Sequence, residues 1–113
     1  MEQMEMDIMQ IITFGGDARS TCIKAIREAR NGNWDEVESL MAKTKESLKV
    51  AHGVQTRLIQ AEIRGEHNEM SLLMVHAQDH LMNAMTVKDL ADELIEESKA
   101  RQELEKIVKE RLS

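Results

Sequence analysis

The segment AIREARNGNWDEVESLM, residues 25–41, joins the end of one amphipathic pattern to the start of another. Before it, apolar side chains recur every three or four positions from about residue 3 to residue 30, the spacing of one helical face. Asn31-Gly32-Asn33 interrupts the pattern, because glycine accommodates a helix end and Asn33 can cap the next helix, with Glu36 completing a capping box. The segment predicts two helices joined by a tight turn.

The patterns outside this segment predict three helices in total. A second apolar stripe runs to about Arg64, and the polar stretch GEHN, residues 65–68, has the composition of another turn. The third pattern begins near Met70 and has no stop signal before Ser113, so this helix could reach about 60 Å at 1.5 Å per residue. Short connections make consecutive helices antiparallel. The expected fold is therefore all-α, an antiparallel up-down-up three-helix bundle in a single domain, and the end of its third helix should bend, fray or project.

Composition supports helices and excludes several classes of protein. The chain of 113 residues has no proline, and only Phe14 and Trp34 are aromatic. The net charge of −6, from 15 basic and 21 acidic residues, argues against nucleic acid as a partner. The single Cys22 excludes an internal disulfide and is expected to be a buried structural thiol. We expect a cytoplasmic protein, since there is neither a leader nor an apolar run of about 20 residues for membrane insertion.

The third helix is apolar on two sides, which predicts self-association. One face carries Leu72, Leu73, Val87, Leu90 and Leu94, and another carries Met74, Leu81, Met85 and Ile95. A helix with two apolar sides is usually packed between two partners. In so small a chain the second partner is expected to be another copy of the same protein.

A polar cluster interrupts the first of these faces. His76, Asp79, His80 and Asn83 project from it, with leucines above and below. Polar groups on a buried face need partners, and three interpretations remain open. Asp79 or Asn83 could hydrogen-bond an imidazole in a purely structural network. His76 and His80, four residues apart, could hold a metal ion with a third ligand from elsewhere. One histidine could instead carry a phosphoryl group, oriented by its neighbours.

Other unusual positions lie outside this cluster. Gly15-Gly16 interrupts a helical pattern at a cost of about 1 kcal/mol per glycine, which predicts a kink or the close approach of another surface. His52 and His67 have no diagnostic spacing and are interpreted as ordinary polar residues.

Three stretches resemble a known family. LMVHAQDHLM (residues 73–82), GDARS (16–20) and AHGVQT (51–56) are similar to the IIA component of bacterial sugar phosphotransferase systems of the lactose/cellobiose family. The resemblance covers about residues 5–96 and leaves residues 97–113 as a helical C-terminal extension. It implies a cytoplasmic three-helix subunit that trimerises into a nine-helix bundle.

The resemblance also implies roles for residues of the motif. His76 would accept a phosphoryl group from the phosphocarrier HPr and pass it to the cysteine of the cognate IIB component. Asp79 would face its two copies across the axis of a homotrimer and share a divalent cation, expected to be Mg²⁺. Gln78 and His80 are candidates for phosphate contacts. Gln78, however, lies near 200° from His76 on the helical wheel, so a neighbouring subunit would have to bring it close.

The motif further suggests a substrate class for the transport system. His-Ala-Gln-Asp-His resembles cellobiose and chitobiose members more than lactose members, which tend to carry glycine after the active histidine. The implied process is uptake of a β-linked disaccharide, bound by the membrane IIC component and never by this chain. The alternative from another class is a non-catalytic, all-helical oligomeric scaffold with a structural His/Asp network.

Overall fold

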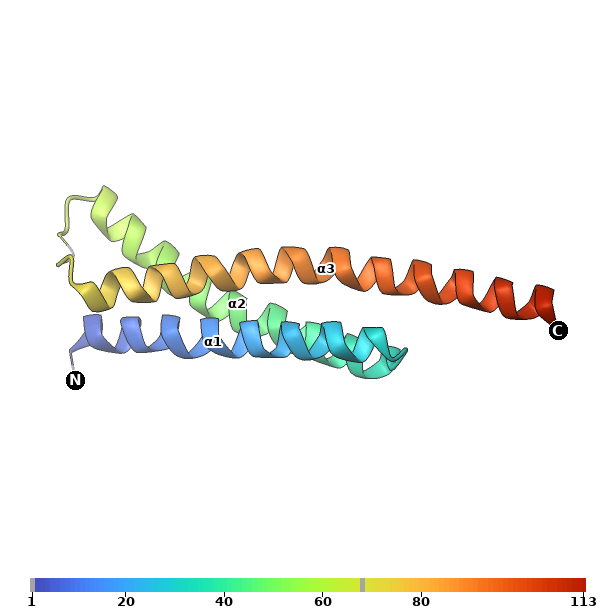
Figure 1. Cartoon of the computed structure of the whole chain (residues 1–113). Helices are drawn as coiled ribbons and strands as arrows, with labels where there is room; N and C mark the ends of the chain where they lie inside the picture. Colours follow the sequence, from blue (N-terminus) through green and yellow to red (C-terminus); the bar gives the residue numbers. More distant parts are fainter. Residues whose placement is uncertain (1, 68) are drawn as a thin grey trace.

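The computed structural model describes residues 2–67 and 69–113 and contains three helices, α1 (Gln3–Arg30), α2 (Trp34–Ile63) and α3 (Leu72–Leu112). They run up, down and up again, so that α1 and α3 are parallel (Figure 1). No strand occurs in these two ranges. The predicted all-α three-helix bundle is confirmed, and the apolar spacing together with the two polar turns placed the helix ends next to those turns within two residues.

The local signals at the helix ends were only partly correct. Gly32 adopts a positive φ of 76°, as a glycine at a helix end should. The predicted capping box is wrong, because the side chain of Asn33 makes no cap hydrogen bond and instead donates to Glu28 Oε2 at 2.6 Å. The third helix begins at Leu72 rather than near Met70, since the hydroxyl of Ser71 accepts a hydrogen bond from the Met74 backbone N–H at 3.1 Å.

Helix α1 is the central element of the bundle. It packs along both α2 and α3, whereas α2 and α3 share few contacts. The interface of α1 with α3 is close at Gly15, where a Cβ atom would lie 3.6 Å from the Cα of Leu81. Of the two outcomes predicted for Gly15-Gly16, the structure shows the close approach, and α1 continues through both glycines as one helix. The main core cluster contains Ile8, Ile11, Ala51, Val54, Leu58, Met74, Ala77 and Leu81.

The molecule is elongated because α3 is longer than its neighbours. Its principal extents are 68 × 23 × 20 Å and its radius of gyration is 18.6 Å, whereas a compact domain of this length would have about 13 Å. Figure 1 shows that α3 continues well past the turn between α1 and α2. Of the three outcomes predicted for its C-terminal part, projection is the one observed.

One face of α3 is buried and the other is uncovered in the single chain. The buried face contains Met74, Ala77, Leu81, Ala84, Ala91 and Ile95. The opposite side, here called the open face, is defined by Leu72, His76, Asp79, Asn83, Leu90 and Leu94. Its three leucines are 87%, 57% and 48% exposed, respectively. Large apolar side chains at such exposure are typical of a surface that binds a partner.

Within residues 2–67 and 69–113, none of the three helices combines the length and apolar character that a membrane span requires.

Candidate functional site

His76 lies on the open face of α3 with its side chain exposed. Its imidazole stacks on that of His80, one helical turn later, with ring centroids 5.6 Å apart and ring planes inclined by 28°. In the described part of the chain, neither ring nitrogen of His76 takes part in a hydrogen bond or an ion pair. The ring is therefore oriented by stacking, and its nitrogens stay available to an incoming group.

His80 connects this face to α1. Its side chain is half-buried, and its Nε2 would lie 3.3 Å from a Cβ atom placed on Gly16. The missing side chain of Gly16 therefore leaves room for the imidazole against the α1 backbone. The two predicted site histidines are brought together, one exposed and one supported by a neighbouring helix.

Asp79 is exposed beside them, and its one hydrogen-bond partner among the described residues is the side-chain amide of Asn83, which donates to Asp79 Oδ2 at 3.5 Å. No hydrogen bond among the described residues joins Asp79 or Asn83 to an imidazole. The structural network that would have explained the polar cluster is therefore not formed within a single chain. The carboxylate of Asp79 has capacity for a further ligand.

The metal interpretations need atoms from outside one chain. In the two ranges that the structure describes, no group of three or more His, Cys, Asp or Glu side chains could hold a metal ion. A site formed by His76 and His80 would lack its third ligand. Asp79 contributes a single carboxylate per chain, so a cation bound there would complete its coordination with water or with carboxylates of other copies.

Gln78 lies on a different side of α3. Its Oε1 accepts a hydrogen bond of 2.6 Å from Gln55 Nε2 on α2, and it lines a cavity of about 200 Å³ together with Leu58 and Met74. Within one chain the structure therefore separates Gln78 from His76, as the helical wheel indicated. The sequence pattern gave no sign of the pairing of Gln78 with Gln55, because nothing in it relates two residues on different helices.

The sequence pattern also gave no direct sign of an ion pair between an exposed arginine and a buried aspartate. The Asp7 side chain is 5% exposed, and its Oδ1 accepts hydrogen bonds from Arg57 at 2.5 Å and from Gln3 at 2.9 Å. Charged side chains are rarely this buried without a partner. The one available signal was the position of an aspartate next to Ile8 on the apolar stripe of α1. This pair joins α1 to α2 and lies away from the open face.

The remaining candidate residues have structural surroundings. Cys22 is fully buried, as predicted, and burial raises the pKa of its thiol. His52 and His67 are exposed. A larger groove, of about 560 Å³, is lined by residues that include Trp34, Met41 and Ile95. Ile95 lies about 28 Å along α3 from His76, at 1.5 Å per residue, so this groove is separate from the histidine pair.

Comparison with known proteins agrees with this arrangement. The family described as "PTS system, Lactose/Cellobiose specific IIA subunit" matches residues 6–99. The lichenan-specific phosphotransferase enzyme IIA component of Bacillus subtilis (strain 168) is 55% identical to this chain over 95 residues, which are 84% of this chain and 86% of the relative.

Solved structures share the fold over nearly the whole chain. The PTS cellobiose-specific enzyme IIA from Bacillus anthracis is 46% identical, with a TM-score of 0.86, and the match covers 90% of this chain and 94% of that one. The IIA(chitobiose) protein, solved in complex with HPr from the N,N'-diacetylchitobiose branch of the Escherichia coli phosphotransferase system, is 34% identical with a TM-score of 0.76. That match covers 90% of this chain and 99% of the other.

Proposed function

This chain belongs to the lactose/cellobiose-specific IIA subunit family of the phosphotransferase system, and from that premise we propose that His76 is its phosphoryl carrier. His76 accepts the group from HPr and passes it to the cysteine of the cognate IIB component. The observation that carries the proposal is the exposed, stacked imidazole of His76. A IIA relative solved with HPr supports the identity of the donor.

The transfer consists of two balanced steps. In the first, a neutral ring nitrogen of His76 donates its lone pair to phosphorus, an N–P bond forms, and the bond between phosphorus and HPr breaks. In the second, the thiolate of the IIB cysteine forms an S–P bond while the N–P bond breaks, and the imidazole regains its lone pair. Reactions of this kind depend mainly on positioning and charge stabilisation. No nucleotide is required in either step.

Two neighbours of His76 are proposed to contact the phosphoryl group. His80 is already adjacent through the ring stack. Gln78 is bound to Gln55 on the far side of α3, so it could contribute only through a neighbouring subunit.

We propose a homotrimer, in which three α3 helices pack into a nine-helix bundle through the Asp79 side of the open face, with His76 at the edge of that contact. The exposed Leu72, Leu90 and Leu94 support it, since burial of apolar area is the main force in association. Three copies of Asp79 would then meet near the axis and repel one another in a medium of low dielectric. The oxygens of Asp79 fit a hard divalent cation, and Mg²⁺ is the proposed ion. Such an ion, when bound, supplies positive charge that offsets the three carboxylates.

The proposed setting is the cytoplasm, where the chain serves uptake of a β-linked disaccharide. A cellobiose-type sugar is favoured over lactose, because the relatives named for lichenan and cellobiose are 55% and 45% identical, whereas those named for lactose are 36–39% identical. The sugar itself binds the membrane IIC component, so this chain determines delivery of the phosphoryl group and not sugar recognition.

Incubation with phosphoenolpyruvate, the upstream phosphodonor protein and HPr tests the proposal. The intact protein should gain the mass of one phosphoryl group, in an acid-labile form. His76→Ala should stay folded and gain none, whereas the exposed controls His52→Ala and His67→Ala should be phosphorylated like the parent. No mass gain in the parent would favour the scaffold alternative, and phosphate on the His76 variant would assign the carrier to another residue.

A further inference from the structure

We propose that Gly16 is a positioning residue for phosphoryl transfer, acting on His76 through His80. The inference rests on the proposed function of His76. Gly16 belongs to α1 and touches neither the phosphoryl group nor His76. The space left by its missing side chain determines where the ring of His80 lies, and that ring determines the orientation of His76.

The contacts around the glycines carry this assignment. A Cβ atom on Gly16 would lie 3.3 Å from His80 Nε2 and 4.0 Å from its Cδ2. The shorter distance is below ordinary van der Waals contact between carbon and nitrogen, so even a methyl group would push the imidazole away. Gly15 differs, because its Cβ would make ordinary contacts of 3.6–3.8 Å, the shortest of them with the Leu81 backbone. At Gly53 a Cβ would meet nothing within 4 Å.

A glycine inside a helix is unfavourable, so its presence at position 16 indicates that a larger side chain does not fit there. Alanine in a helix interior is favoured over glycine by about 1 kcal/mol. At Gly16, a larger residue would gain that preference and displace His80. The ring of His80 is half-buried and belongs to a flexible side chain, so the expected response to a methyl group is movement of the ring and not loss of the fold.

Movement of His80 reaches His76 directly. The two rings stack at 5.6 Å, and this is the contact that orients the exposed His76 ring in the described part of the chain. A change at Gly16 on the α1 backbone therefore acts first on the ring of His80 and through it on the ring of His76. Because the attacking nitrogen must align with phosphorus, a shift of a few tenths of an ångström at His80 lowers the rate of transfer.

Three glycine-to-alanine variants test the proposal. With phospho-HPr as donor, Gly16→Ala should lower kcat roughly 3- to 30-fold with KM unchanged, since the donor still docks and only alignment is lost. Gly15→Ala and Gly53→Ala are the matched controls and should keep the parent kcat. All three should melt at or above the parent temperature. NMR of the ring protons of His76 should show a shift in Gly16→Ala alone, because the ring current of His80 changes.

A double-mutant cycle with His80→Ala separates positioning from general damage. His80→Ala should shift the His76 ring resonances and lower kcat, and adding Gly16→Ala should then have no further effect on either. An equal fall in kcat with and without the ring of His80 would overturn the proposal, as would a Gly16→Ala protein with parent kcat and unshifted His76 resonances. A parent that takes no phosphate would refute the proposed function instead, and the NMR comparison would still decide whether Gly16 orients His76. A Gly16→Ala protein that fails to fold would also overturn the proposal, since the expected response is movement of the His80 ring, and so would unshifted His76 resonances in His80→Ala.

Discussion

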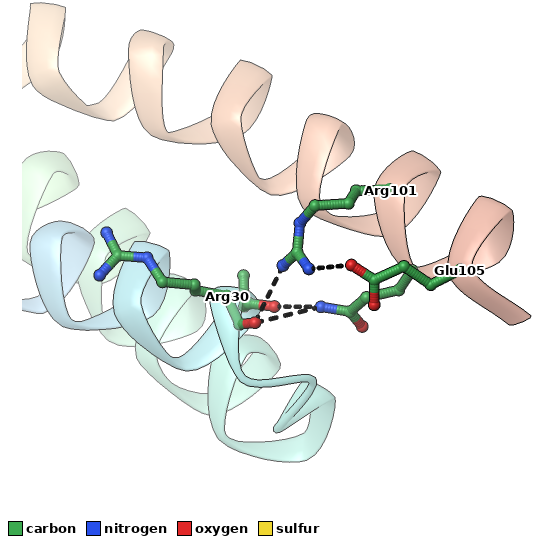
Figure 2. A network of polar contacts seen from close by, with 5 residues as sticks. Arg30, Arg101 and Glu105 are labelled. Atoms are coloured by element: carbon green, nitrogen blue, oxygen red, sulfur yellow. Dashed lines mark hydrogen bonds and ion pairs between the residues drawn. The ribbon is translucent and has the colours of Figure 1, made fainter.

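The side-chain amide of Gln102 donates a hydrogen bond of 2.7 Å to the backbone carbonyl of Ala29, seventy-three residues earlier in the chain. Arg101 reinforces this contact by donating from Nη2 to the carbonyl of Arg30 at 3.0 Å, while its Nη1 pairs with Glu105 (Figure 2). The last carbonyls of an α-helix have no partner within the helix. The projecting part of α3, beyond the residues 6–99 that match the family, therefore caps the C-terminus of α1.

Because Gln102 lies beside Gly32, replacing Gly32 by alanine should destabilise the protein more than the same change at Gly65. Gly32 and Gly65 both have positive φ, where alanine costs about 1–2 kcal/mol. A Cβ on Gly32 would also lie 3.2 Å from Gln102 Oε1, whereas one on Gly65 meets nothing within 4 Å. Urea unfolding should therefore show a larger loss of stability for Gly32→Ala than for Gly65→Ala. In a Gln102→Ala background the cost of Gly32→Ala should fall to that of Gly65→Ala, and equal costs in the parent background would contradict the cap.

If the Asp79 carboxylates share a cation, the thermal stability of the protein should depend on metal. Removing a ligand that binds only the assembled state withdraws its linkage free energy, so, if the proposed trimer holds a cation, a chelator should lower the melting temperature of the parent protein. Asp79→Leu removes the three like charges and the need for a cation together. Exchange of a buried ionic cluster for apolar groups is often neutral or stabilising by about 1–4 kcal/mol, so this variant should remain trimeric and ignore chelator.

Sedimentation and thermal melts, with and without chelator, check this prediction. A parent trimer indifferent to chelator, together with a clearly weakened Asp79→Leu protein, would remove the axial cation from the proposal. The assignment of His76 would be unaffected by that outcome.

The buried carboxylate of Asp7 predicts that one exposed arginine matters more than another. Arg57→Ala leaves Asp7 with Gln3 as its remaining hydrogen-bond partner, and a buried group that loses its partner costs about 1–3 kcal/mol. Arg64 is the matched control, since both it and its partner Glu66 are more than half exposed. Arg64→Ala should cost less than about 1 kcal/mol. Chemical denaturation of both variants measures the difference, and equal costs would show that the Asp7 pair contributes no more than a surface pair.

Because the thiol of Cys22 is buried, the free energy of unfolding should fall in alkaline solution. Burial raises the pKa of its thiol above the ordinary value of 9.0, so the folded state keeps a proton that the unfolded state loses. The unfolded state then binds fewer protons, and the free energy of unfolding falls as the pH rises above about 9.0. Below that pH the contribution is fully present. Denaturation curves at several pH values should show a shallower decline for Cys22→Ala, and identical declines would refute a role for this thiol.

Several features of this protein followed from the sequence alone, because they depend on neighbours along the chain. Helical periodicity, the glycine turn at Gly32 and the unusual length of the third helix all follow from local backbone preferences and side-chain spacing. The placement of His76, Asp79 and His80 on one side of α3 also follows, because three and four residues make about one helical turn. The capping box at Asn33 failed for a related reason, since Glu28 of the preceding helix bound the asparagine amide instead.

Only the tertiary structure decided which residues meet across helices. The contacts of Gly16 with His80, Gln55 with Gln78, Arg57 with Asp7 and Gln102 with Ala29 all depend on the axial offset and rotation of one helix against another. Those two quantities come from the packing of whole apolar faces, to which many distant residues contribute small terms. The helical repeat determines which side chains share a face. It does not determine the height at which that face meets the neighbouring helix, and a shift of one turn would change the partner in each of these four contacts.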